Sequence, residues 1–139
     1  MWGSTGIMAS AIASGLEDEG VPVRIIDIQK NHHSDVMTEL ADCGAVIVGS
    51  ATHNNNVLPG IADVLTYMKG LRPLNRVGAA FGSYGWSGES PKIIQEWLAS
   101  MNMDMPADPV KCLFVPKHEG LSQCVALGKT VAEALKAKC

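Results

Sequence analysis

Apolar residues along this chain follow two alternating patterns, one typical of strands and the other of helices. Short, continuous apolar runs lie at 45–49 and 77–81, and such runs are typical of strands buried on both faces of a parallel sheet. The second run belongs to a predicted strand at 76–81. A further strand is predicted at 21–28, which is rich in β-branched residues. Another is predicted at 110–115, where flanking prolines and Lys111 indicate an outer position in the sheet.

Between these predicted strands, apolar residues recur at the spacing of an amphipathic helix. The predicted helices run from Ser4 or Thr5 as the capping residue to Gly20, over 35–42, from Pro59 to Gly70, from near Pro91 to Met101, and over 121–135. Strands that alternate with helices predict an α/β fold with an open parallel sheet and helices on both faces. We find no internal repeat or linker that would divide the chain.

Composition narrows the class of protein. The chain has 139 residues, of which 47% are hydrophobic and 18% charged, so we expect one domain with a single core. The formal net charge is −3 and the basic residues are scattered, which argues against a nucleic-acid surface. No apolar run approaches the roughly 20 residues that cross a bilayer, so we expect no membrane association. Four widely spaced cysteines without a CxxC pair indicate free thiols and a cytoplasmic location.

Three polar stretches, at 1–5, 50–56 and 82–88, each precede a predicted helix, and the last two follow strands directly. Because the carboxyl ends of parallel strands open on one edge of the sheet, where such folds bind ligands, we expect the three stretches to converge. Any shared chemistry would therefore act on a single ligand.

The first stretch places backbone N–H groups and two hydroxyls at a helix N-terminus. Trp2, Gly3, Ser4 and Thr5 contain no charged side chain, and no Lys or Arg precedes Arg24. A helix N-terminus favours an anion, and the lysine of the triphosphate-binding loop is absent. The stretch therefore indicates a neutral cradle for a phosphate monoester, with a simple helix cap as the alternative.

The second stretch is rich in amides. Thr52, His53, Asn54 and Asn55 can hydrogen-bond the edge of a heterocycle, and the alternative is an Asx-rich turn that leads into the helix at Pro59.

The third stretch combines glycines with aromatic residues. Gly85 and Gly88 let the backbone approach a ligand closely, while Tyr84 and Trp86 offer flat faces to a planar one. A glycine-rich connection whose aromatics cover the edge of the sheet is the alternative.

Together, a phosphate cradle, an amide-rich loop and an aromatic loop describe an FMN site. At this point the chain resembles a family, the short-chain flavodoxin-like domain of flavodiiron proteins or A-type flavoproteins, and most of all their rubredoxin:oxygen oxidoreductase branch. The resemblance covers essentially the whole chain. It is carried by Met-Trp-Gly-Ser-Thr at 1–5, Thr-His-Asn-Asn at 52–55, Leu-Thr-Tyr-Met-Lys-Gly-Leu-Arg-Pro at 65–73 and Phe-Gly-Ser-Tyr-Gly-Trp-Ser-Gly-Glu at 81–89.

The resemblance implies a flavodoxin-like, open, parallel five-stranded sheet. Its first, central strand would precede the phosphate loop, and that strand is missing from the 139 residues. It also implies bound FMN, with Trp86 against the isoalloxazine ring, no catalytic side chain and no metal ligand. The implied flavin-binding residues are Trp2, Gly3, Ser4, Thr5, Thr52, His53, Asn54, Asn55, Ser83, Tyr84, Gly85, Trp86 and Gly88.

The resemblance further implies an electron-transfer role. A rubredoxin-like donor would reduce the FMN, which would pass electrons to a diiron metallo-β-lactamase-like domain that reduces oxygen or nitric oxide. The chain would then be a C-terminal fragment of a homo-oligomeric flavodiiron protein, and it would not act alone on the terminal acceptor.

Two other functions remain open from the sequence. One is a flavodoxin-fold binding or regulatory module without flavin, since Asn56 stands where the family pattern often has Gly. The other is an independent flavin reductase that uses a nicotinamide nucleotide, although no basic pocket for a 2′-phosphate is evident.

Overall fold

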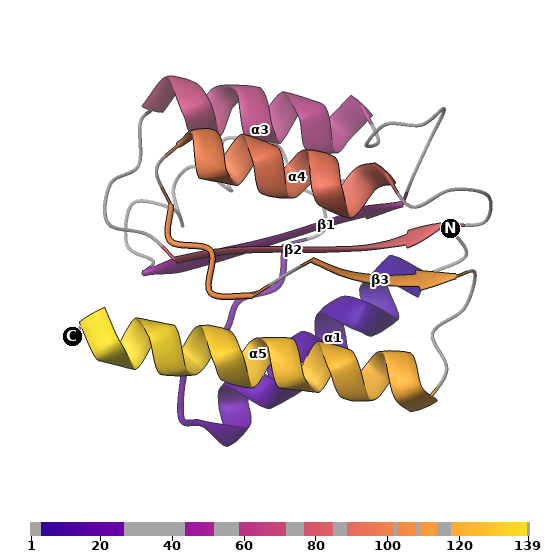
Figure 1. Cartoon of the computed structure of the whole chain (residues 1–139), viewed down its shortest axis with the longest axis vertical. Coiled ribbons are helices and arrows are strands. Elements are labelled where there is room, and N and C mark those ends of the chain that lie inside the picture. Colours follow the sequence, from indigo (N-terminus) through magenta and orange to yellow (C-terminus); the bar gives the residue numbers. More distant parts are fainter. Residues whose placement is uncertain are drawn as a thin grey trace.

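The computed structural model describes residues 4–26, 44–51, 59–71, 77–84, 89–101, 103–107, 109–113 and 118–138. In chain order, the elements of this part are α1 (Ser4–Asp18), β1 (Ala45–Ala51), α3 (Pro59–Leu71), β2 (Val77–Tyr84), α4 (Glu89–Ser100), β3 (Val110–Leu113) and α5 (His118–Lys138). Figure 1 shows them as three layers, with the sheet between α3 and α4 on one face and α1 and α5 on the other.

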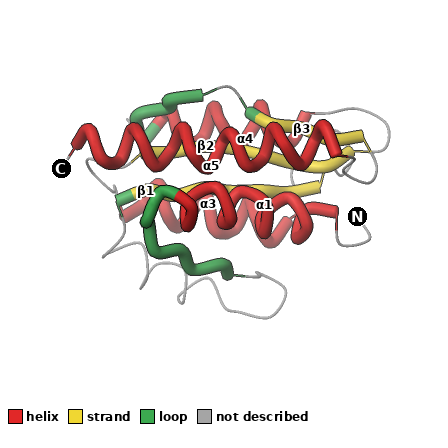
Figure 2. Tube along the Cα trace, turned by 90° about the horizontal axis from the view of Figure 1, so that it is seen from below, coloured by secondary structure: helices red, strands yellow, loops and turns green. Residues whose placement is uncertain are grey.

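The strands form a parallel sheet in the order β1-β2-β3. β1 pairs with β2 from Ala45 opposite Val77 to Ala51 opposite Ser83, and β2 pairs with β3 from Phe81 opposite Val110 onward. The α/β architecture, the parallel strands and the helices on both faces are thus confirmed. Figure 2, seen from below, shows that helices and strands run in roughly the same direction. Within the described residues, β3 has a neighbour on one side only, which agrees with its predicted outer position.

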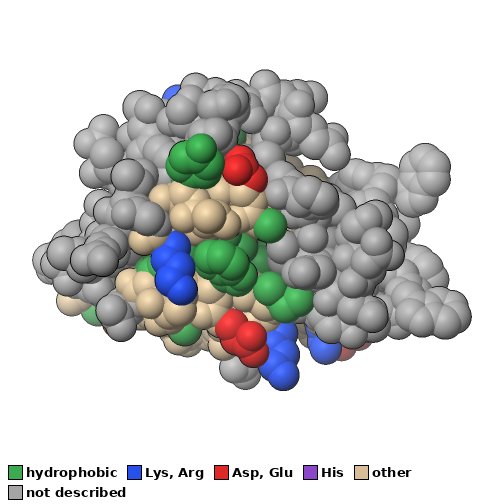
Figure 3. Space-filling model, turned by 90° about the horizontal axis from the view of Figure 1, so that it is seen from above, with side chains coloured by type: hydrophobic (Ala, Val, Ile, Leu, Met, Phe, Trp, Pro, Cys, Tyr) green, Lys and Arg blue, Asp and Glu red, His purple; other side chains and the backbone are tan. Residues whose placement is uncertain are grey.

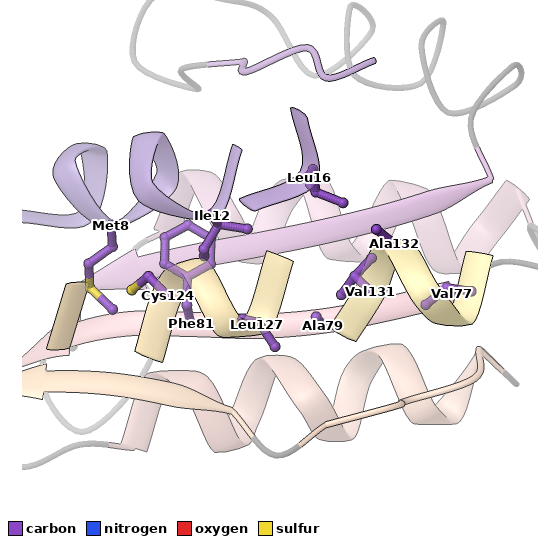
Figure 4. Close-up of a cluster of buried hydrophobic side chains, with 10 residues drawn as sticks. All are labelled: Met8, Ile12, Leu16, Val77, Ala79, Phe81, Cys124, Leu127, Val131 and Ala132. Atoms are coloured by element: carbon purple, nitrogen blue, oxygen red, sulfur yellow. The ribbon is translucent and has the colours of Figure 1, made fainter. Parts of the chain in front are cut away.

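Side-chain alternation along β2 gives the sheet two apolar faces. Val77, Ala79 and Phe81 belong to the core under α1 and α5, whereas Ala80 belongs to the core under α3 and α4. This is the period-2 pattern of a strand that is buried on both faces. Figure 4 shows the first core, where side chains of α1 and α5 meet those of β2.

The predicted strand at 21–28 is wrong over its described part. Residues 21–26 follow the turn at Gly20, which has a φ of 78°, but they form no strand and Ile25 is 56% exposed. A strand needs a hydrogen-bonded neighbour, and among the described residues β1 pairs only with β2. Residues 27–28 and the predicted helix at 35–42 lie outside the described residues.

The strand predicted to end at Phe81 continues to Tyr84. Gly82, Ser83 and Tyr84 pair with β3, and the first two of them also pair with β1. Glycine and serine have low strand propensity, but pairing with neighbouring strands outweighs it. The following helix begins at Glu89, which leaves Pro91 in its first turn, where its missing N–H costs no intrahelical hydrogen bond.

The outer surface of α3 and α4 carries a mixed set of side chains. Lys69 of α3 lies over the ring of Trp97 of α4, with 5.5 Å between Nζ and the ring centroid. Trp97 packs partly buried on the core beneath, as its helical spacing among aliphatic residues predicts. Hydrophobic, acidic and basic side chains are interspersed on this face, and those of the described residues form no basic stripe (Figure 3).

Candidate functional site

The candidate site lies at the edge of the sheet where β1 and β2 end. Ala51, the last residue of β1, is paired with Ser83, and β2 ends one residue later at Tyr84. Paired strands lie about 4.8 Å apart, so the two chain segments leave the sheet side by side. The second and third predicted stretches, 50–56 and 82–88, therefore begin on neighbouring strands, where Ser50 is paired with Gly82.

The N-terminus of α1 lies at the same edge. Figure 1 shows the start of this helix on the side to which the arrowheads of β1, β2 and β3 point. Ser4 and Thr5 are its first two residues, and its first turn contains no acidic residue. The unpaired N–H groups and the helix dipole therefore face this edge, and the first turn of α1 itself carries no negative charge that would oppose an anion.

The described backbone brings four predicted site residues to this edge: Ser4 and Thr5 in the first turn of α1, and Ser83 and Tyr84 at the end of β2. The remaining predicted residues, Trp2, Gly3, Thr52, His53, Asn54, Asn55, Gly85, Trp86 and Gly88, lie outside the described residues.

One residue near this edge was not among the predicted flavin ligands. Ser50 of β1 is 1% exposed and lies opposite Gly82 of β2. Ser50 makes an interaction within the structure, as buried polar residues generally do. The signal was present in the sequence, because Ser50 is the first polar side chain after a continuous apolar run.

The described residues at this edge fit FMN. A neutral helix N-terminus suits a phosphate monoester, and two adjacent strand ends give a ring access to backbone groups of both. Among the described residues, no cluster of three or more His, Cys, Asp or Glu could hold a metal ion. The described part of the chain also contains no helix with the length and hydropathy needed to span a membrane.

A parallel sheet covered on both faces, with its candidate site beyond the strand ends, defines an open α/β protein of the doubly wound class. The family model described as Flavodoxin matches residues 1–128, and the chain belongs to this family. A solved archaeal flavodoxin is 34% identical, with a TM-score of 0.86 and coverage of 98% of this chain and 93% of its own.

Relatives with curated names narrow the type of flavodoxin domain. The rubredoxin-oxygen oxidoreductase of Megalodesulfovibrio gigas is 53% identical over 99% of this chain and 34% of its own length. The nitric oxide reductase of Moorella thermoacetica is 41% identical over 95% of this chain and 33% of its own length. The solved rubredoxin oxygen:oxidoreductase of Desulfovibrio gigas matches 99% of this chain and 34% of its own, with 53% identity and a TM-score of 0.97.

The chain therefore spans about a third of the length of the curated relatives it matches. The chain is thus a flavodoxin-family domain that is similar to the matching third of these oxidoreductases, as the motifs at 52–55, 65–73 and 81–89 indicated. Domains of this type bind FMN, which confirms the cofactor predicted from the three loops.

Proposed function

We propose that this chain is an electron-transfer module that takes electrons from a rubredoxin-like donor onto FMN. It would pass them to a diiron centre that reduces oxygen or nitric oxide. The observation that carries the proposal is the edge where β1 and β2 end in register beside the N-terminus of α1. The names of the two curated relatives support the choice of donor and acceptors.

Each loop has a distinct role in this proposal. Trp2, Gly3, Ser4 and Thr5 bind the phosphate with neutral donors at the start of α1. The loop at 52–55 hydrogen-bonds the edge of the flavin, and the loop at 83–88 covers its ring, with Trp86 against it.

Bound FMN supplies the redox chemistry, because it exchanges electrons singly or in pairs. The chain binds and orients the cofactor and excludes water from one face of the ring. No side chain needs to act as acid, base or nucleophile.

The proposal extends to the setting of the module. The 139 residues form one domain, which works as the C-terminal part of a cytoplasmic flavodiiron protein. The acceptor is a metallo-β-lactamase-like domain that carries the diiron centre, and homo-oligomers bring FMN and diiron sites together.

A titration of the purified chain with FMN tests the cofactor part of this proposal. Purified protein is freed of ligand and titrated with FMN, and quenching of flavin fluorescence is recorded. We expect saturation at one FMN per chain and a yellow protein. The same titration is run on a variant extended before Met1 by an apolar strand-forming segment, because the described β1 is paired on one side only. No binding by either protein would favour the module without flavin.

A rapid-mixing experiment tests the relay. The FMN-loaded chain is mixed with a reduced rubredoxin, and bleaching of the flavin absorbance is followed. We expect reduction by the rubredoxin and no steady consumption of NADH or NADPH by the isolated chain. Steady consumption of either nucleotide would instead identify an independent flavin reductase.

A further inference from the structure

A short extended segment, residues 103–105, lies beside the start of β2, away from the edge where the strands end. Asp104 forms a parallel bridge with Val77, and the N–H of Gly78 donates a hydrogen bond of 2.8 Å to the carbonyl of Asp104. The segment therefore extends the sheet alongside β2 before the chain reaches β3 at Val110.

Two methionine sulfurs converge on Gly78. A Cβ built on Gly78 would lie 3.0 Å from Sδ of Met105 and 3.1 Å from Sδ of Met103. Residues two apart in an extended segment point to the same face, and both methionines pack on the core under α3 and α4. The two thioethers thus occupy the space beside Gly78 that a larger side chain would fill. This contact holds residues 103–105 against β2.

The two methionines differ in their access to solvent. Met103 is 6% exposed, and the other buried methionines of the described residues are Met8, Met68 and Met101. Met105 is only partly buried. Oxidation of a thioether follows exposure, so Met105 is the described methionine that an oxidant in solution reaches first.

We propose that Met105 is a modification site for hydroperoxides, and that its sulfoxide loosens the 103–105 segment from β2. Sulfur attacks the terminal oxygen of the peroxide, the O–O bond breaks and an S–O bond forms. The thioether loses two electrons to the peroxide, which is reduced to water when the oxidant is hydrogen peroxide. Methionine sulfoxide reductases can reverse the step.

The sulfoxide loosens the segment because it adds a strong acceptor to a side chain that packs on the apolar core under α3 and α4. The backbone N–H of Gly78, against which Met105 packs, is already bonded to the carbonyl of Asp104. Burying an acceptor without a partner is unfavourable, so the oxidised side chain turns toward water and leaves Gly78. Met103 then packs against Gly78 without its neighbour.

Peptide mass spectrometry of the full chain during hydrogen peroxide treatment tests the site. We expect sulfoxide at Met105 before Met8, Met68, Met101 and Met103, with fragment ions separating the three methionines at 101–105. The Tm of the protein should fall by roughly 3–10 °C as the fraction of Met105 sulfoxide rises. Treatment with a methionine sulfoxide reductase should restore the original Tm.

Two leucine variants separate Met105 from its neighbour. Met105→Leu keeps an apolar side chain and should abolish the early, peroxide-induced fall in Tm. The matched variant Met103→Leu should keep it. Oxidation of Met105 no faster than of Met103, or an equal fall in Tm for Met105→Leu, overturns the proposal.

A third variant probes the consequence without oxidant. Met105→Gln places a polar group of similar length at the same position and should lower the Tm of untreated protein in the direction of the sulfoxide. A Met105→Gln protein that unfolds at the wild-type temperature would show that the contact with Gly78 does not hold the segment.

Discussion

Two glycines set how closely α1 and α5 approach each other. A Cβ on Gly15 of α1 would collide with the carbonyl oxygen of Val125, and a Cβ on Gly128 of α5 would collide with that of Ile12. The clashing atoms are backbone, which cannot turn aside as a flexible side chain can. Helical propensity alone would favour alanine at both positions, so these glycines are explained by the helix contact rather than by local structure.

Gly128→Ala should therefore destabilise the fold. The new methyl group forces α5 away from Ile12, and overpacking of this kind costs about 1–3 kcal/mol, against a propensity gain of about 1 kcal/mol. Urea unfolding measures the net change. Gly6→Ala is the matched control, because its Cβ would meet nothing within 4 Å and alanine should stabilise α1. If Gly128→Ala proves as stable as Gly6→Ala, the close helix contact is refuted.

Exposed charge contacts should matter far less than this packing. Lys136 lies 3.3 Å from the carboxylate of Glu19, with the lysine side chain 54% exposed, and Lys69 lies over Trp97. Water and salt screen such contacts, so Lys136→Met and Lys69→Met should each change the free energy of unfolding by less than about 1 kcal/mol. The same urea experiment in low and high salt checks this. A loss as large as that of Gly128→Ala from either variant would contradict this ranking.

At the scale of elements, sequence patterns predicted those strands and helices that bury a periodic apolar face. The run at 45–49 lies within β1, and the helix predicted from Pro59 is α3. The errors occur where pairing with a neighbouring strand, rather than the local sequence pattern, determines whether a segment forms a strand. Residues 21–26 have β-branched side chains but no described neighbour to pair with, whereas Gly82 and Ser83 have poor propensity but a strand on each side.

The location of the candidate site was also predictable from the sequence. The sequence predicted that three loops share one edge, because parallel strands impose this on any residues that follow them. The described backbone supports it for the start of α1 and for the ends of β1 and β2. Ser50 lies in the predicted stretch at 50–56 but was not among the predicted flavin ligands, because nothing in a single sequence shows whether the last residues of a strand reach the ligand.

The sheet predicts a gradient of local stability. β2 pairs with strands on both sides, while the described β3 pairs with β2 alone over four residues. Amide hydrogen exchange should be slowest in β2 at 79–83 and approach the rate of global unfolding there, with β3 opening earlier. Native-state exchange read by NMR measures this. Protection in β3 equal to that in β2 would contradict the observed strand order.

At the scale of the whole molecule, the ligand edge joins parts of the chain that are distant in sequence. The start of α1 and the ends of β1 and β2 all meet there, so a ligand that binds only the folded state stabilises the entire domain. Sub-global opening of any of these elements would release the ligand, which couples flavin affinity to the integrity of the fold.

This coupling predicts a difference between FMN and riboflavin. FMN at 100 times its dissociation constant should stabilise the chain by about 2.7 kcal/mol, and differential scanning fluorimetry would record the rise in Tm. Riboflavin has the same ring but no phosphate, so it cannot use the acid-free first turn of α1 and should raise Tm much less at equal concentration. Inorganic phosphate at the same concentration controls for a general anion effect. Equal shifts with FMN and riboflavin would show that the N-terminus of α1 does not bind the phosphate, even if the ring still lies at the ends of β1 and β2.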